Sequence, residues 1–149
     1  MASAALGAIR LRSDRREGDP VGVLDRGRLR PCSIRARDQA LRFARLRAAA
    51  FDLDQGVVVH GDAHPGNALM VPAPREGAES GFVLVDPDGF LADPTYDLGV
   101  VLRDWSSQLL VGDAMAVAHR YCDRLAAQSG LDGEAIWQWG YVERVSSGL

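Results

Sequence analysis

Lysine is absent from this sequence. All 17 basic residues among the 149 are arginines. This chain therefore has no side-chain amine to contribute, which excludes a Schiff base on one of its residues or a lysine of its own paired with phosphate. Cys32 and Cys122 stand far apart and match no disulfide framework or metal-ligand spacing. There is no apolar stretch of membrane-spanning length and no cationic segment typical of a secretory signal. We therefore expect a reduced, cytoplasmic protein with no membrane partner.

The composition is that of an ordinary globular domain, with 47% hydrophobic and 25% charged residues, which is enough for one hydrophobic core. The charge is divided unevenly along the chain. Residues 1–50 hold 12 arginines against 5 acidic residues, a net charge of +7. Residues 51–149 hold 5 arginines against 15 acidic residues, a net charge of −10. Two unlike segments are therefore expected.

The first segment, residues 1–36, is rich in Arg, Gly and Asp and has no sustained helical or strand period, which predicts a poorly ordered leader. A basic arm for nucleic acid is its functional interpretation. However, the segment has no aromatic residue that could stack on a base, and acidic residues dilute its charge. We therefore expect a solvated leader and no nucleic-acid partner.

From Arg37 onward the hydrophobic pattern predicts a second unit, residues 37–149, of α+β class. Its expected elements are a helix over 37–50, strands over 57–59, 68–71 and 82–85, and helices over 93–110, 113–130 and from 132 to the C-terminal end. The second and third strands are expected to pair antiparallel. Three aspartates stand where helix N-caps are expected, namely Asp93, Asp113 and Asp132.

The densest polar segment is the loop 60–67, His-Gly-Asp-Ala-His-Pro-Gly-Asn, which follows the strand 57–59. Asp86 follows the strand 82–85 in the same way. A loop that leaves a buried strand often carries function, because the strand fixes its position while the loop exposes polar groups. These two segments are therefore the candidate functional site.

Two metal-dependent chemistries suit this site. In phosphoryl transfer, Asp62 would orient and deprotonate an attacking hydroxyl, while oxygens of Asn67 and Asp86 would hold Mg²⁺ on the phosphates. In a metallohydrolase, His60, Asp62 and His64 would ligate zinc or iron, because residues i, i+2 and i+4 of an extended segment point to one side. Against the second interpretation, the glycines and proline of the loop favour a tight turn over a flat row of ligands.

A third interpretation is a phosphatase of the haloacid dehalogenase type, because residues 83–89 combine a hydrophobic strand with Asp-x-Asp-Gly. It fails, since that chemistry requires a later lysine. Taken singly, each candidate also has a structural explanation: His60 as a core hydrogen-bonding group, His64 as a loop cap, and Asp97 as a carboxylate at a helix N-terminus. Their joint order and spacing favour phosphoryl transfer.

The stretches VVVHGDAHPGNALMV (57–71) and GFVLVDPDGFLADPTYDLGVVLRDW (81–105) together resemble the aminoglycoside phosphotransferase family, and most of all its branch of streptomycin phosphotransferases and hydroxyurea-resistance kinases. The loop His-Gly-Asp-x-His-x-x-Asn is similar to the catalytic loop of protein kinases, and the strand ending at Asp86 to their Asp-Phe-Gly segment. Asp-Pro-x-Tyr-Asp-Leu is a further family signature. The resemblance covers about residues 38–149 and does not include 1–36.

The resemblance implies the C-terminal, mainly helical lobe of a protein-kinase-like fold, with a short β-hairpin that carries the catalytic and metal-binding loops. It implies that Asp62 is the catalytic base and that Asn67 and Asp86 are Mg²⁺ ligands. The residues expected to support the catalytic loop are His60, His64 and Asp97.

The acceptor would lie against the acidic C-terminal helices, which suit a cationic aminoglycoside. The residues we expect to contact it are Asp104, Trp105 and Glu143.

The implied reaction transfers the γ-phosphoryl group of ATP to a hydroxyl of an aminoglycoside-type antibiotic, with ATP and Mg²⁺ as cofactors. Family members bind ATP under an N-terminal lobe that carries a strand lysine. We expect this chain to lack that lobe and therefore to show no measurable phosphotransfer alone. The alternative is a catalytically inactive fragment that at most binds the antibiotic or a partner.

Overall fold

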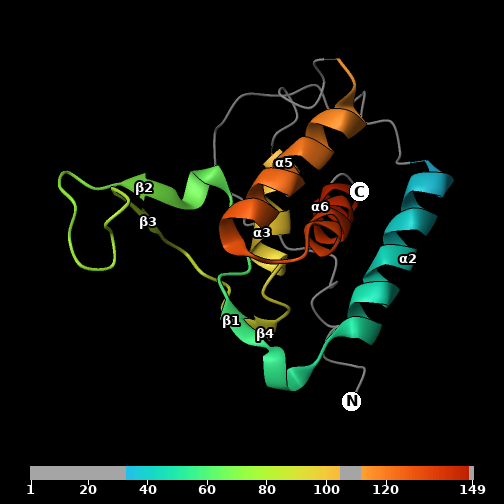
Figure 1. Ribbon diagram of the computed structural model, residues 1–149, viewed down its shortest axis with the longest axis horizontal. Helices are drawn as coiled ribbons and strands as arrows, with labels where there is room; N and C mark the ends of the chain where they lie inside the picture. The colour runs from blue at the N-terminus through green and yellow to red at the C-terminus, as the bar shows by residue number, and fades with distance from the viewer. Residues whose placement is uncertain (1–32, 105–111, 148–149) are drawn as a thin grey trace, which may run out of the picture.

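The computed structural model describes residues 33–104 and 112–147, and the architecture is α+β (Figure 1). Helices form the body, and two short antiparallel ribbons lie to one side of it. The principal elements are α2 (Ile34–Ala50), β1 (Val57–Val59), β2 (Ala68–Met70), β3 (Phe82–Leu84), β4 (Phe90–Ala92), α3 (Tyr96–Val100), α5 (Ala114–Ser129) and α6 (Gly133–Ser147). Three 3₁₀ turns join them, η2 (Leu53–Gln55), η3 (Pro65–Asn67) and η4 (Val101–Asp104).

Helix α2 begins at Ile34, three residues before the predicted start at Arg37. The reason is a local cap, because the side chain of Ser33 accepts a hydrogen bond from the backbone N–H of Ala36 at 3.2 Å. The first residues of the helix therefore fall in the range that the sequence assigned to the leader. The buried side chains of α2 are the small Ala40 and Ala44, which let the helix lie close to α6.

The sequence predicts the strand pairing of one ribbon but not that of the other. Strand β2 pairs antiparallel with β3, as predicted. Strand β1 pairs antiparallel with β4, and the sequence analysis did not predict β4. Eight residues (60–67) separate β1 from β2, whereas five (85–89) separate β3 from β4. The longer connection, residues 60–67, must therefore bulge out where the chain passes from one ribbon to the other. This bulge is the candidate catalytic loop.

The helix predicted over 93–110 is wrong in its start and its continuity. Asp93 does not cap the first helical turn. Its Oδ1 accepts hydrogen bonds from the backbone N–H and the hydroxyl of Thr95, and α3 begins only at Tyr96. After Val100 the chain continues as the 3₁₀ turn η4. The remainder of the predicted helix, 105–110, lies outside the described residues.

The last two predicted helices are confirmed. Asp113 caps α5 by accepting from the N–H groups of Met115 and Ala116. Gly130 ends α5 in the left-handed conformation, with φ 73°. Asp132 then accepts from the N–H of Glu134 at the start of α6. These signals are local, which is why the sequence alone was sufficient to place both helices.

Helix α6 is the centre of the molecule and contacts α2, α3, η4 and α5. It crosses α3 so closely that a Cβ on Gly99 would lie only 2.5 Å from the Cβ of Trp139. One core cluster contains Val59, Tyr96 and Val100, and a second contains Leu102, Cys122 and Ile136. The first cluster holds β1 and β4 against the helices, so it fixes the stem from which the candidate loop emerges.

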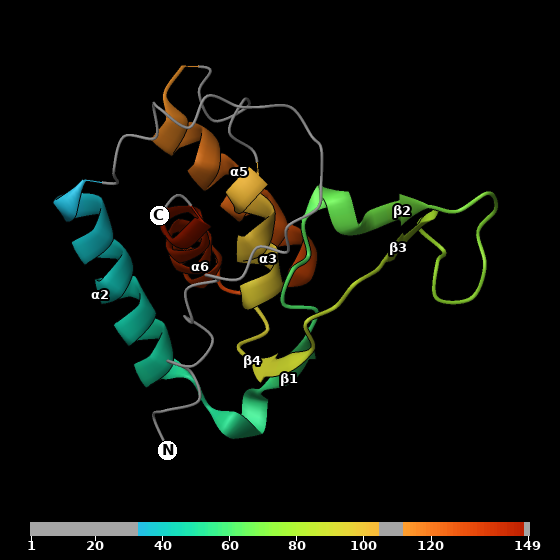
Figure 2. The ribbon, with the colours of Figure 1, turned by 180° about the vertical axis from the view of Figure 1, so that it is seen from behind.

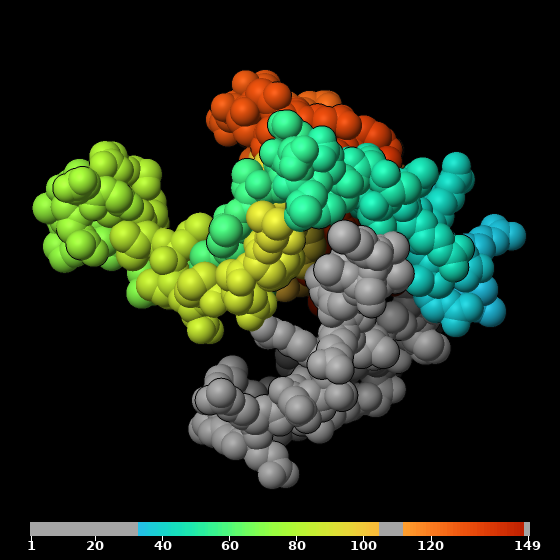
Figure 3. Space-filling model, turned by 90° about the horizontal axis from the view of Figure 1, so that it is seen from below, coloured from blue at the N-terminus to red at the C-terminus, as the bar shows by residue number. Residues whose placement is uncertain are grey.

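The β2–β3 ribbon projects away from the helices, as the view from behind shows (Figure 2). In the space-filling view its tip forms a lobe of its own (Figure 3). Its strands expose four large apolar side chains, Leu69, Met70, Phe82 and Leu84, of which Met70 is 78% accessible, whereas Ala78 between the strands is buried. No helix in the described ranges is long and apolar enough to cross a membrane.

Candidate active site

The loop 60–67 turns sharply at its second residue. Gly61 has φ 85°, and a Cβ there would lie 2.5 Å from a ring carbon of Phe90. Both conditions favour glycine. The carboxylate of Asp97 then holds the turn, since it accepts from the backbone N–H of His60 at 2.7 Å and of Gly61 at 2.8 Å. Helix α3 thereby fixes the start of the loop.

His60 joins the two polar segments of the site. Its Nδ1 accepts from the N–H of Asp62 at 3.3 Å, and its Nε2 lies 3.0 Å from the carbonyl oxygen of Val85. A neutral ring with its proton on Nε2 satisfies both contacts. The carbonyl of His60 also accepts from the N–H groups of Asp88 and Gly89. The segment that follows β3 is therefore bound directly to the candidate catalytic loop.

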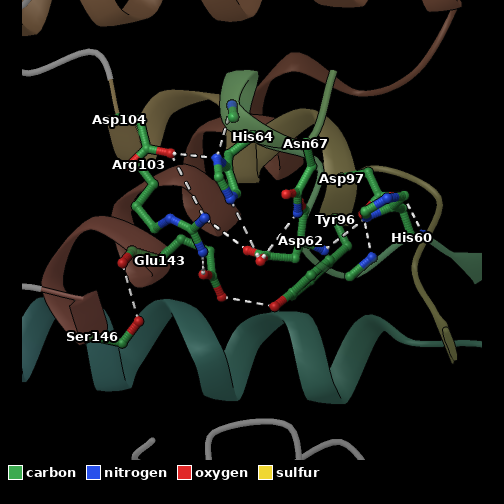
Figure 4. A network of polar contacts seen from close by, with 12 residues as sticks. His60, Asp62, His64, Asn67, Tyr96, Asp97, Arg103, Asp104, Glu143 and Ser146 are labelled. Atoms are coloured by element: carbon green, nitrogen blue, oxygen red, sulfur yellow. Dashed lines mark hydrogen bonds and ion pairs between the residues drawn. The ribbon is translucent and has the colours of Figure 1, made fainter. Parts of the chain in front are cut away.

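Asp62 lies at the centre of a polar network (Figure 4). Its side chain is only 14% exposed, and its Oδ1 accepts from Nη2 of Arg103 at 2.7 Å. Asn67 donates from Nδ2 to the backbone carbonyl of Asp62 at 3.0 Å, which closes the loop on itself. Nε2 of His64 lies 3.6 Å from Oδ2 of Asp62. His64 thus stands beside the proposed base.

The pairing of β2 with β3 brings Asn67 and Asp86 to the same end of one ribbon. The N–H of Val85 donates to the carbonyl of Asn67 at 2.9 Å, which extends the ladder by one residue beyond the strands. Asp86 follows directly with φ 59°, an unusual conformation for a residue other than glycine. Its side chain is exposed. The Asn67 amide nitrogen is turned toward Asp62, and its amide oxygen is the second side-chain oxygen donor at this end of the ribbon.

These two oxygen donors suit a hard cation such as Mg²⁺, which takes one or two protein ligands and completes its shell with water and phosphate oxygens. Within residues 33–104 and 112–147, no group of three or more His, Cys, Asp or Glu side chains is placed to hold a metal ion. That arrangement also disfavours zinc or iron ligation by His60, Asp62 and His64.

The sequence analysis did not anticipate Arg103. Besides Asp62, its guanidinium lies 3.7 Å from Asp104 and 3.8 Å from Glu143. Burial opposes the charge, but the hydrogen bond to Asp62 and the three neighbouring carboxylates outweigh it and raise the pKa of Arg103. Arg103 is one of only five arginines in the acidic part of the chain, 51–149. This scarcity is the signal by which the sequence could have singled out Arg103 as a partner for the acidic residues of the site.

Glu143, expected to contact the acceptor, lies inside this network. Its Oε1 accepts from the hydroxyl of Tyr96 at 2.8 Å, while its Oε2 faces Arg103. Asp104, expected in the same role, is 43% exposed and lies 3.4 Å from Nδ1 of His64. Trp105 lies outside the described residues.

The fold and the site define an α+β protein in which a polar loop carries an aspartate that is fixed by an arginine, with the polar side chains of Asn67 and Asp86 nearby. The chain belongs to the phosphotransferase enzyme family, whose model matches residues 8–137. That range takes in most of residues 1–36, which the sequence resemblance does not cover, and it ends before the C-terminal segment, which the resemblance does cover. No curated protein and no solved structure matches the chain. Membership implies phosphotransferase activity in general.

Proposed function

We propose that the loop 60–67 and the segment 85–89 form the catalytic part of a kinase that transfers the γ-phosphoryl group of ATP to a hydroxyl of an aminoglycoside-type antibiotic. In this proposal the described unit corresponds to the C-terminal lobe of a protein-kinase-like fold. The observation that carries it is the convergence of Asp62, Asn67 and Asp86 at one end of the β2–β3 ribbon.

Each residue has a distinct role in this reaction. Asp62 orients the acceptor hydroxyl and takes its proton as the new bond to phosphorus forms. Asn67 and Asp86 would hold Mg²⁺, which when bound neutralises charge on the phosphates. His60 and Asp97 keep the loop in place through the hydrogen bonds described above. Positioning and charge neutralisation supply nearly all of the catalysis in phosphoryl transfer.

The class of acceptor follows from charge. The segment 51–149 has 15 acidic residues and 5 arginines, and Asp104 and Glu143 lie beside Arg103, which contacts Asp62 from the helical side of the site. A negative surface attracts a polycationic substrate and raises its local concentration. Streptomycin is our first candidate, because the sequence resembles the streptomycin branch of the family most.

The test compares two proteins, the full chain alone and the full chain joined behind the ATP-binding lobe of a streptomycin phosphotransferase. Both are incubated with Mg²⁺, ATP and streptomycin, and phosphorylated antibiotic is measured by mass spectrometry. Because the chain has no lysine of its own to pair with ATP phosphates, we expect product only from the joined protein.

Substitution of the base sharpens this test. Asp62→Asn should lower turnover of the joined protein by about 10²–10⁴-fold, the range for loss of a general base. Asp123→Asn, at an exposed aspartate on α5, should leave turnover unchanged. A folded joined protein that binds Mg·ATP but forms no product would refute the proposal. Full turnover by Asp62→Asn would refute the role of Asp62.

A second candidate function is binding without turnover, and the absence of lysine is the observation that favours it. Under this alternative, streptomycin raises the melting temperature of the chain when ATP is absent, while the joined protein forms no product. Turnover by the joined protein that depends on Asp62 would contradict it.

A further inference from the structure

We propose that Arg103 is the positioning residue of the catalytic base, holding the Asp62 carboxylate at one oxygen and so setting the direction that the other oxygen faces. The inference rests on the proposed function and assigns a role to a residue that the sequence motifs do not include.

The two oxygens of the Asp62 carboxylate have different surroundings. Oδ1 accepts from Nη2 of Arg103 at 2.7 Å, a short charge-assisted hydrogen bond. Oδ2 makes longer contacts, 3.4 Å to Nδ2 of Asn67 and 3.6 Å to Nε2 of His64. The contact with Arg103 is the shortest of these three, and its loss would remove the charge-assisted hydrogen bond that orients the carboxylate.

Arg103 is itself held from two further elements. Its Nη1 lies 3.8 Å from Glu143 on α6, and Glu143 accepts from the buried hydroxyl of Tyr96 on α3 at 2.8 Å. Arg144 donates to the backbone carbonyl of Arg103. The side chains of Arg103 and Glu143 are 19% and 16% exposed, so solvent screens their attraction less than on an open surface. The α3–α6 crossing thereby supports the base through Arg103.

The shape of the guanidinium matters as well as its charge. Nη2 of Arg103 lies 2.7 Å from Asp62 and 3.7 Å from Asp104, while Nη1 faces Glu143 at 3.8 Å. The planar fork thereby fixes the direction from which Oδ1 of Asp62 is held. A lysine could supply the charge but not this fork.

The first measurement needs no turnover. Urea denaturation of the full chain is compared for the native protein, Arg103→Gln, Asp62→Asn and the double variant. We expect Arg103→Gln to lower the urea midpoint of the native protein but to change that of Asp62→Asn much less, because the second variant has already lost the charge-assisted contact. Arg124→Gln, at an exposed arginine on α5, is the control and should shift both midpoints equally. Equal shifts by Arg103→Gln in both backgrounds would overturn the proposal.

The second measurement uses the joined protein. We expect Arg103→Gln to lower kcat by about 10²-fold, as a misplaced catalytic group does, with KM for ATP and for streptomycin unchanged. Arg103→Lys should restore part of kcat. Glu143→Gln, which loosens Arg103 indirectly, should act in the same direction with a smaller effect.

The outcomes separate the two proposals. Unchanged kcat, or a changed KM for streptomycin with kcat intact, would overturn the positioning role. If the native joined protein has no turnover, the proposed function fails, and the urea comparison then decides by itself whether Arg103 holds the Asp62 carboxylate. Should Arg103→Gln fail to fold by circular dichroism, Arg103→Lys and Glu143→Gln carry both measurements.

Discussion

At the scale of single residues, burial and neighbouring charge decide how the polar groups of this site behave. Tyr96 shows this most clearly. It is buried in the core cluster with Val59 and Val100, and its hydroxyl donates to Glu143. Burial, followed by the charge of Glu143 and the hydrogen bond to it, raises the pKa of Tyr96 above that of an exposed tyrosine. The hydroxyl therefore stays protonated and continues to hold Glu143 toward Arg103.

This shift predicts how stability depends on pH. The raised pKa means that the folded state keeps the Tyr96 proton while the unfolded state loses it above pH ~10. The free energy of unfolding should fall above that pH by up to about 1.4 kcal/mol per pH unit. The fall should be reduced in Tyr96→Phe and retained in Tyr121→Phe. Urea denaturation between pH 8 and 11 measures it, and no lysine titrates in that window. Equal slopes in all three proteins would contradict the prediction.

At the scale of elements, the α3–α6 crossing is the contact that holds the site together. A Cβ on Gly99 would lie 2.7 Å from the backbone nitrogen of Gly140 as well as 2.5 Å from Trp139. Backbone cannot rotate away as a flexible side chain can. The glycine lies in sequence between Asp97, which holds the loop, and Arg103, which contacts Asp62, so the approach of these two helices affects both.

We therefore expect Gly99→Ala to destabilise the protein by about 1–3 kcal/mol, the usual range for overpacking. Gly133→Ala is the matched control, because a Cβ there meets its nearest atom at 3.3 Å and the first turn of α6 accepts alanine. Urea denaturation of both variants gives the comparison. If Gly99→Ala proved as stable as Gly133→Ala, the close crossing would not exist in solution.

The two ribbons differ in how far they are packed. Phe82 on β3 is 53% exposed, whereas Phe90 on β4 packs edge-to-face against Tyr96 at 5.3 Å between ring centroids. Phe90→Ala should destabilise the protein by about 2–4 kcal/mol, and Phe82→Ala by less than about 1 kcal/mol. Thermal or urea unfolding of both variants is the measurement. Similar losses would mean that the β2–β3 ribbon is covered in solution.

At the scale of the whole molecule, α6 connects the two core clusters, since Trp139 packs against the first and Ile136 belongs to the second. A single helix shared in this way couples the unfolding of both regions. The described residues should therefore unfold in one cooperative transition, although the ribbons expose much apolar surface.

Cys122 offers a test of that cooperativity. Burial raises the pKa of its thiol to about 11, so at pH 8 it should react with a thiol reagent only after unfolding. In a Cys32→Ser variant, the urea midpoint from pulse labelling of Cys122 should agree with midpoints from tryptophan fluorescence and circular dichroism. Labelling at a lower urea concentration than the fluorescence transition would show that the second cluster opens separately.

The sequence by itself determined the elements whose signals are local. Aspartate caps and an αL glycine placed α5 and α6, because capping bonds join residues two or three positions apart. Two short apolar runs with a loop rich in Pro, Gly and Glu between them placed β2 and β3 and predicted that they pair. The motif from His60 to Asn67 identified the polar loop, and its order together with Asp86 indicated the phosphotransferase family, to which the chain belongs.

Only the tertiary structure decided the contacts between distant parts of the chain. Strand β4 is three residues long and exists because β1 lies beside it. The bond from Arg103 to Asp62 spans 41 positions, and those from His60 and Gly61 to Asp97 span 37 and 36. No local periodicity encodes such pairs. They form because α6 packs against α3 and η4, which brings the carboxylates and the arginine of separate elements to one loop.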